Sequence, residues 1–139
     1  EKVRREKGLD DGGSGVLDQL VLARLLQDAS YDRHVRTARR RNHHRRATLR
    51  NELEVALPGA RLEGMEAGLH AIVRLAEPVD LAVLRSAAAA RSVGVYPLAA
   101  PGDARATALI VGYAALSEPA LRSGVPLLAE AVAEATVGR

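Results

Sequence analysis

The chain has 139 residues, 20 basic and 17 acidic side chains, a formal net charge of +3 at pH 7 and no cysteine. This length fits one domain with or without a tail, and folding can bury roughly two-thirds of the unfolded chain's surface. The lack of cysteine excludes disulfides, thiolate zinc sites, iron–sulfur clusters and cysteine nucleophiles, and it is typical of a cytoplasmic protein. The chain has three tyrosines and neither phenylalanine nor tryptophan. It therefore lacks the several aromatic side chains on which RNA-recognition sheets and single-strand-binding grooves stack bases.

The start of the chain reads as a tail. Residues 1–15 are mostly charged and end in Gly12, Gly13, Ser14 and Gly15, so we expect a flexible linker there, with Ser14 able to cap the helix that follows. We expect the globular part over 16–139. No apolar run is long enough to cross a membrane. Because the first residue is Glu rather than Met, we expect a piece of a longer protein.

Two helices are predicted next. Apolar residues recur at helical spacing over 16–29 and again over 32–57, where Asp32 is the expected cap. The second stripe is interrupted at 42–46, which reads Asn-His-His-Arg-Arg. That stretch therefore lies in solvent or meets a polar surface of another domain or partner.

The second helix also carries a run of arginine. Between residues 33 and 50 there are eight arginines and no acidic residue, the composition expected of a surface that contacts phosphates or another acidic group. They are Arg33, Arg36, Arg39, Arg40, Arg41, Arg45, Arg46 and Arg50. No turn-helix partner of the winged-helix type precedes them, so a solvated helix that pairs with a neighbouring domain is the alternative.

The rest of the chain predicts alternating strands and helices. Strands are expected over 60–63, 69–75, 93–98 and 108–114. Helices are expected over 81–91 and from 118 onward, capped by Asp80 and Ser117, with a kink at Pro126. Paired strands separated by single helices predict an α+β fold: a small, mostly antiparallel four-stranded sheet covered by helices on one face.

Motifs for independent catalysis are missing from the sequence. His43 and His44 are adjacent and cannot chelate a metal together from one helix, and His70 is expected to be a packing residue, so no metal site is predicted. There is no nucleophile elbow. Lys2 and Lys7, both in the predicted tail, are the only lysines, whereas a Schiff-base lysine must be buried to lose its proton near neutrality. We therefore predict neither catalytic nor cofactor-binding residues in this chain.

Several motifs, taken together and in order, resemble the small domain of MocR-type regulators of the GntR superfamily. The resemblance covers roughly residues 15–135 and rests on Tyr31-Asp32-Arg33-His34, Arg45-Arg46, Pro58-Gly59, Ala67-Gly68-Leu69-His70, Gly94-Val95-Tyr96-Pro97-Leu98 and Gly112-Tyr113-Ala114-Ala115-Leu116-Ser117-Glu118. Such regulators join a winged-helix DNA-binding domain to a domain shaped like a fold-type I aminotransferase. The resemblance implies that this chain is the C-terminal small subdomain of the second part.

The resemblance carries further expectations. Pyridoxal 5'-phosphate is held by the upstream large domain of the intact parent and not by this chain. The parent contacts DNA through its winged helix and forms a homodimer, in the cytoplasm and away from membranes. Aminotransferase-like proteins usually place an arginine on the strand before the Gly-Tyr position to grip a substrate carboxylate. Here that place falls near Ala108, and the nearest arginine is Arg105, which we expect in a loop. Either Arg105 swings in to bind the carboxylate, which makes it the candidate residue, or the effector is held differently.

Two other functions remain open. The chain can be the small domain of a genuine pyridoxal phosphate aminotransferase, which shares the fold but not the regulatory role. It can also be a nucleic-acid-binding module that uses the basic helix over 33–50. Whether the parent is an enzyme is left open by the sequence.

Overall fold

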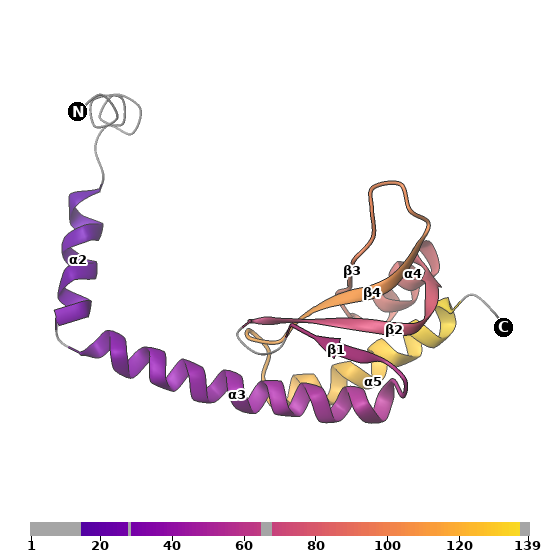
Figure 1. Cartoon of the computed structure of the whole chain (residues 1–139), viewed down its shortest axis with the longest axis horizontal. Helices are drawn as coiled ribbons and strands as arrows, with labels where there is room; N and C mark the ends of the chain where they lie inside the picture. The colour runs from indigo at the N-terminus through magenta and orange to yellow at the C-terminus, as the bar shows by residue number, and fades with distance from the viewer. Residues whose placement is uncertain (1–14, 28, 65–67, 137–139) are drawn as a thin grey trace. The chain divides into compact units, whose positions relative to one another are not determined.

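The computed structural model describes residues 15–27, 29–64 and 68–136, and these form two compact units that divide between Arg40 and Arg41. Apart from Gly15, the predicted linker and its cap Ser14 lie outside the described residues. The elements follow the predicted order (Figure 1): α2 (Val16–Gln27), α3 (Ser30–Ala56), β1 (Arg61–Glu63), β2 (His70–Asp80), α4 (Leu81–Ala90), β3 (Tyr96–Pro97), β4 (Arg105–Gly112) and α5 (Glu118–Ala135).

The first unit contains α2 and the beginning of α3. The helix α2 ends at Gln27, two residues before the predicted end, and Ala29 has the left-handed φ of 58° that stops helices. The helix α3 begins at Ser30, so the prediction that Asp32 caps it is wrong. Asp32 lies inside the first turn instead, where its carboxylate still favours the positive end of the helix dipole.

The second half of α3 belongs to the second unit and follows the predicted stripe. Leu49 and Leu53 are completely buried. The helix ends at Ala56, just before Pro58 and Gly59, and Gly59 has a φ of 92° that suits glycine. The chain then turns back into β1.

The four strands form one antiparallel sheet in the order β1-β2-β4-β3. Strand β2 is longer than predicted and reaches Asp80, with a register shift between Arg74 and Val79. Pro78 lies in the shifted stretch; because it has no backbone N–H, it is tolerated at such an irregularity. Strand β4 begins at Arg105, which corrects the expectation that this residue lies in a loop.

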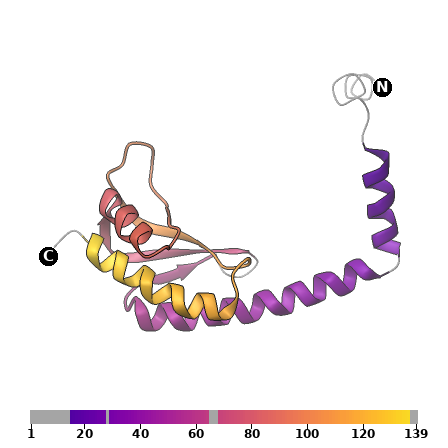
Figure 2. The same cartoon turned by 180° about the vertical axis from the view of Figure 1, so that it is seen from behind.

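Helices α4 and α5 lie on the same side of the sheet (Figure 2), and both predicted caps are confirmed. The Asp80 carboxylate accepts hydrogen bonds from the N–H groups of Ala82 and Val83 at 2.9 and 3.0 Å. The Ser117 hydroxyl accepts one from the N–H of Ala120 at 3.3 Å. Helix α5 continues through Pro126, which is exposed; the predicted kink stays a prediction.

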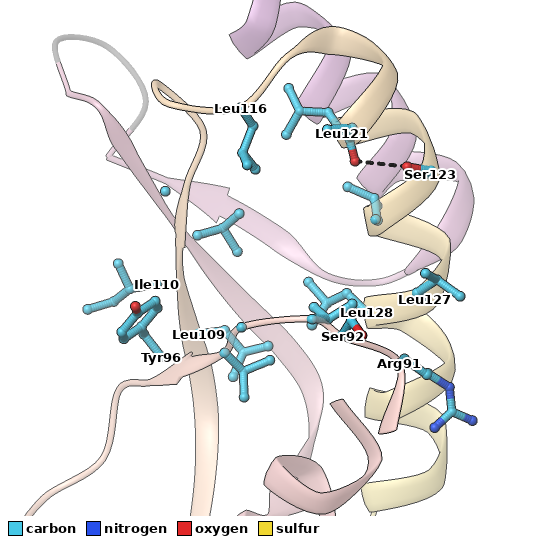
Figure 3. A pocket seen from close by; sticks show the side chains of 18 residues that line it. Arg91, Ser92, Tyr96, Leu109, Ile110, Leu116, Leu121, Ser123, Leu127 and Leu128 are labelled. Atoms are coloured by element: carbon cyan, nitrogen blue, oxygen red, sulfur yellow. Dashed lines mark hydrogen bonds between the residues drawn. The ribbon is translucent and has the colours of Figure 1, made fainter. Parts of the chain in front are cut away.

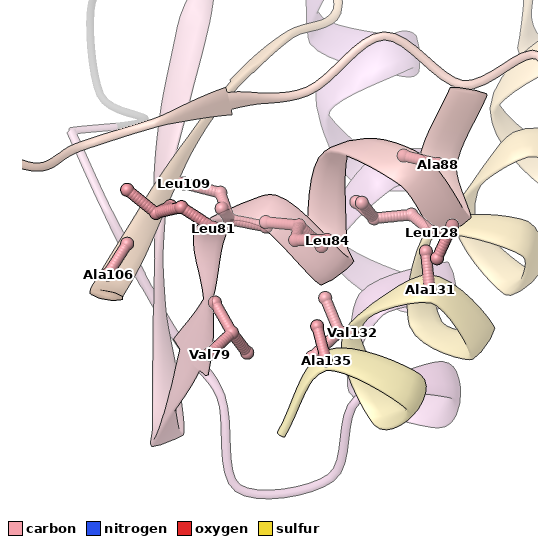
Figure 4. Close-up of a cluster of buried hydrophobic side chains, with 11 residues drawn as sticks. Val79, Leu81, Leu84, Ala88, Ala106, Leu109, Leu128, Ala131, Val132 and Ala135 are labelled. Atoms are coloured by element: carbon pink, nitrogen blue, oxygen red, sulfur yellow. The ribbon is translucent and has the colours of Figure 1, made fainter. Parts of the chain in front are cut away.

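The core lies between one face of the sheet and these helices, in two clusters. One joins the second half of α3 to β2 and to the start of α5. The other joins the ends of β2 and β4 to α4 and to the rest of α5 (Figure 4), and it contains Val79, Leu81, Leu84, Ala87, Ala88, Ala106, Leu109, Leu128, Ala131, Val132 and Ala135. Full burial of a large aliphatic side chain contributes about 1.5–3 kcal/mol. The predicted α+β class, with helices covering one face of the sheet, is confirmed.

Candidate functional site

The two faces of the sheet differ. The alternation along β2 directs Ala71 and Val73 into the core and leaves His70, Ile72 and Arg74 on the other face. On that second face Ile72 is half-buried, and Ile110 of β4 lies opposite it and is also half-buried. Beyond Ile110 lies Tyr96 of β3, which is 71% exposed.

Gly112 ends β4 under the ring of His70. The two residues are paired across the sheet, and a Cβ atom added to Gly112 would lie 3.2 Å from Cδ2 of the imidazole. A side chain at this position would therefore displace the ring. His70 itself is exposed, so the packing role expected for it stays a prediction.

Tyr113 anchors the segment that follows β4. It is 1% exposed, and its hydroxyl donates a hydrogen bond of 2.5 Å to the carbonyl of Gly68. Its N–H donates to the carbonyl of Leu69 at 3.2 Å. The motif residues Gly68, Leu69, Gly112 and Tyr113, far apart in the sequence, thus meet at one end of the β2·β4 pair.

The same segment is held from α3. The guanidinium of Arg45 donates a hydrogen bond to the carbonyl of Ala114, and the Thr48 hydroxyl donates to the Glu118 carboxylate at 3.4 Å. The sequence left two surroundings open for 42–46, solvent or a surface outside the chain. The structure corrects this for Arg45, which binds a carbonyl of its own chain, whereas His43 and His44 are exposed.

Arg105 stands apart from this end of the sheet. It is the first residue of β4, paired with Asp80, and it is exposed. It precedes Gly112 by seven residues (112 − 105), which is about 23 Å along a strand. The structure therefore does not bring Arg105 to the Gly112–Tyr113 position, and its role in carboxylate binding stays a prediction.

A cavity that the sequence did not predict lies between β4 and α5 (Figure 3). Its volume is about 460 Å³, within the range of about 300–1,000 Å³ found for ligand pockets. Its walls are mostly apolar and come from the segment before β3, the end of β4, the turn at Leu116 and one side of α5. The sequence feature that could have indicated this cavity is a set of three glycines that all line it: Gly94, Gly112 and Gly124.

One charged side chain, Arg91, lies at the rim of the cavity. Its guanidinium pairs with Glu130 and Glu134 at 3.1 Å each and donates to the carbonyl of Ala87 at 3.0 Å. The hydrogen bond with Glu130 is the largest effect on the pKa of Arg91 and raises it above its ordinary value; desolvation, the second largest, opposes the rise, and the interactions with Glu134 add to it. The positive charge of Arg91 at the cavity is thus already paired with carboxylates of the same chain.

Within residues 15–27, 29–64 and 68–136, no three His, Asp or Glu side chains gather as metal ligands would. His43 contacts Arg46 at 3.4 Å. In the same ranges no helix has the length and apolar character needed to cross a membrane.

Solved structures with a similar fold are aminotransferases. The kynurenine aminotransferase of Pyrococcus horikoshii matches 96% of this chain with 34% of its own, at a TM-score of 0.80 and 22% identity. The alpha-aminoadipate aminotransferase of Thermus thermophilus matches 94% of this chain with 34% of its own, at a TM-score of 0.74 and 22% identity. The multiple substrate aminotransferase of Thermococcus profundus matches 79% of this chain with 28% of its own, at a TM-score of 0.66 and 24% identity.

The chain thus spans about a third of the length of the solved structures it resembles. No family model matches the sequence, and no curated protein matches it. At these identities the likeness concerns the fold, and the four-stranded α+β sheet is similar to the small domains of aminotransferases.

Proposed function

We propose that this chain is the effector-sensing small domain of a pyridoxal phosphate-dependent, aminotransferase-like transcription regulator of the MocR type in the GntR superfamily. It closes over an amine or amino-acid effector and relays that state to a winged-helix DNA-binding domain of the same polypeptide. One observation carries the proposal: 96% of the chain aligns with only a third of an aminotransferase, at a TM-score of 0.80.

Pyridoxal phosphate does not fit the residues that the structure describes. The group needs a lysine for its covalent link, and the sequence has none after Lys7. The proposal therefore assigns the cofactor to an upstream large domain of the parent. The same proposal has the parent act as a cytoplasmic homodimer that contacts DNA through its winged helix.

Strand β4 lacks an arginine at the place where aminotransferase-like proteins usually carry one, which bears on how a carboxylate is held in either candidate. An aminotransferase must grip its substrate carboxylate, for which a bidentate arginine is the usual means. From Ala106 to Gly112 the strand has no arginine, and Arg105 lies at its far end. The proposal gives Arg105 the carboxylate of an effector that reaches that end of β4.

The second candidate is the small domain of a genuine aminotransferase, which is favoured by the activity named for all three solved structures. A nucleic-acid-binding module is the third. Six arginines of the basic run are exposed, whereas Arg45 and Arg46 are half-buried, and Arg45 is bound to the carbonyl of Ala114.

The test uses the intact parent protein and DNA from upstream of its own gene. Mobility shift is measured with pyridoxal phosphate and a panel of amines and amino acids, expecting one compound to change DNA affinity by about tenfold, a coupling of about 1.4 kcal/mol. Arg105→Ala should abolish this response and Arg61→Ala, on another exposed strand arginine, should preserve it. An unchanged response in Arg105→Ala removes that residue from the site.

Two results contradict the regulatory role. Transamination by an intact protein that binds no DNA identifies the genuine aminotransferase. Binding of DNA by the 139-residue chain alone, with an affinity that falls steeply as salt rises, identifies the nucleic-acid module.

A further inference from the structure

We propose that the cavity between β4 and α5 is a binding site for a small neutral molecule with an apolar body and one hydrogen-bonding group. The inference goes beyond the proposed function and does not depend on it, because the site is built only from residues of this chain. The site is also separate from the role proposed for Arg105, which begins β4 and does not line the cavity.

The walls of the cavity are continuous with the hydrophobic core. Leu109 of β4 and Leu121 and Leu128 of α5 line it and are only 1–5% exposed. In Figure 3 the space lies between β4 and α5, with Leu116 at one end and Ser92 at the other. Leu116 also lines the cavity and is 41% exposed. A molecule in this space would remove apolar surface from water, which is the main driving force for binding at such walls.

The volume of the cavity fits a small organic molecule. It is about 460 Å³, roughly three times the volume of about 150 Å³ at which an engineered apolar cavity already binds benzene. Pockets for small organic ligands measure about 300–1,000 Å³. The space is therefore suited to a molecule of one or two rings rather than to an ion.

Two glycines keep this space open without a packing reason of their own. Gly94 and Gly124 both line the cavity, and a Cβ atom added to either would have nothing within 4 Å. Gly124 lies inside α5, where glycine destabilises a helix relative to alanine. Gly112 differs, because a Cβ atom there would meet the ring of His70. The small size of Gly124 thus serves the cavity and not the packing of the described residues.

Ser92 supplies a hydrogen-bonding group at the rim. It has a left-handed φ of 57° just after α4, a position that usually takes glycine. The N–H groups of Ser92 and Val93 donate to the carbonyls of Ala89 and Ala88 at 3.0 and 2.9 Å. Its hydroxyl makes no hydrogen bond to another residue that the structure describes. A strained serine with an unused hydroxyl beside a cavity is the type of residue that gathers at ligand sites.

The charges at the walls favour a neutral ligand. Arg91 is the one charged residue among the described residues that line the cavity, and its guanidinium is already paired with Glu130 and Glu134 at 3.1 Å each. The Ser123 hydroxyl donates to the carbonyl of Ala120 at 3.3 Å. An anion would have to displace a carboxylate from Arg91, whereas a neutral molecule leaves both ion pairs intact.

The edge of the sheet excludes an added strand as the occupant. Tyr96 pairs with Ile110, and the same register places Val95 opposite Val111. Val95 is half-buried and packs with Val111 against the core. The chain itself therefore covers the edge of β4 beside the cavity, and what remains is a space enclosed by side chains, which suits a small molecule.

Indole is a suitable probe because it has an apolar double ring and a single N–H group. The ¹⁵N-labelled 139-residue chain is titrated with indole and followed by NMR. We expect saturable shifts of the amides of Gly94, Gly112 and Gly124 with one common Kd below about 1 mM. The amides of Gly59 and Gly102, which do not line the cavity, should not shift. Lack of saturable shifts at the three lining glycines overturns the proposal.

A pair of variants tests whether indole occupies the cavity. Gly124→Leu should fill it and weaken indole binding by more than about tenfold. Because leucine is the better helix former, this variant should also melt at a higher temperature, which shows that it is folded. Ala133→Leu adds the same side chain at an exposed position of α5 outside the cavity and should bind indole as the unsubstituted chain does. Unchanged binding in Gly124→Leu, or equal losses in the two variants, contradicts the site.

A second variant tests the hydrogen-bonding group. Ser92→Ala should weaken indole binding by roughly threefold to tenfold, the loss expected for one hydrogen bond. It should leave the binding of 1-methylindole unchanged, because that probe has no N–H group to donate. Equal losses for the two probes, or no loss for indole, would contradict the role given to the Ser92 hydroxyl.

Discussion

Helices α2 and α5 carry apolar residues at similar spacing but differ completely in burial. Six side chains of α5 are buried, whereas α2 has no buried side chain, and its large apolar residues from Val16 to Leu26 are 42–74% exposed. The difference is that α5 lies against β2 and α4. Helical spacing thus defines an apolar face, and a sheet or second helix is needed to turn that face into a core.

The largest expected effect comes from emptying the core that α3 shares with the sheet. Leu53 is fully buried, so Leu53→Ala should lower the free energy of unfolding by about 2–5 kcal/mol, from lost transfer energy and the cavity left behind. Urea unfolding followed by circular dichroism measures it.

The matched control is Leu25→Ala in α2, where the side chain is 42% exposed. It should change stability by less than about 0.5 kcal/mol. Equal losses in the two variants would mean that α2 is as well packed as α3, against the contrast drawn above.

A smaller change, of opposite sign, is expected within α5. Pro126 lies inside the helix on an exposed position and removes one backbone hydrogen bond, so Pro126→Ala should raise the unfolding free energy by about 1–3 kcal/mol. Thermal unfolding measures this, with Ala133→Gly as a variant that should lower stability by about 1 kcal/mol. A loss of stability in Pro126→Ala would show that the helix requires the proline.

Removing one tyrosine hydroxyl from each unit compares a buried side chain with an exposed one. Tyr113→Phe removes the hydrogen bond to the Gly68 carbonyl and should cost about 0.5–1.5 kcal/mol. Tyr31→Phe, on the 44% exposed residue of the first unit, should cost nothing measurable. If both variants unfold at the same urea concentration as the 139-residue chain without a substitution, the hydrogen bond of Tyr113 does not hold the segment after β4.

The smallest effect is expected from removing the first unit. No side chain before Thr48 is buried among the described residues, so a chain of residues 41–139 should unfold within about 1 kcal/mol of the full chain. Calorimetry provides the measurement. A truncated chain that fails to fold would show that the first unit supports the second.

The sequence predicted the order of the elements, both confirmed caps and the core stripe of α3, because each depends on nearby residues. It missed features that depend on distant ones. The continuation of β2 past Pro78 is set by pairing with β4, and the Arg45 bond spans 69 positions to Ala114. The cavity was missed for the same reason, since Gly94, Gly112 and Gly124 come from three separate segments.

The central claim is that this chain covers chemistry performed by another part of its parent, and locating the cofactor tests it most directly. The intact parent is incubated with pyridoxal phosphate, reduced with borohydride, digested and analysed by mass spectrometry. We predict a single phosphopyridoxyl group on a lysine outside the 139 residues. A stoichiometric label on Lys2 or Lys7, or a parent that takes up no cofactor, would contradict the account.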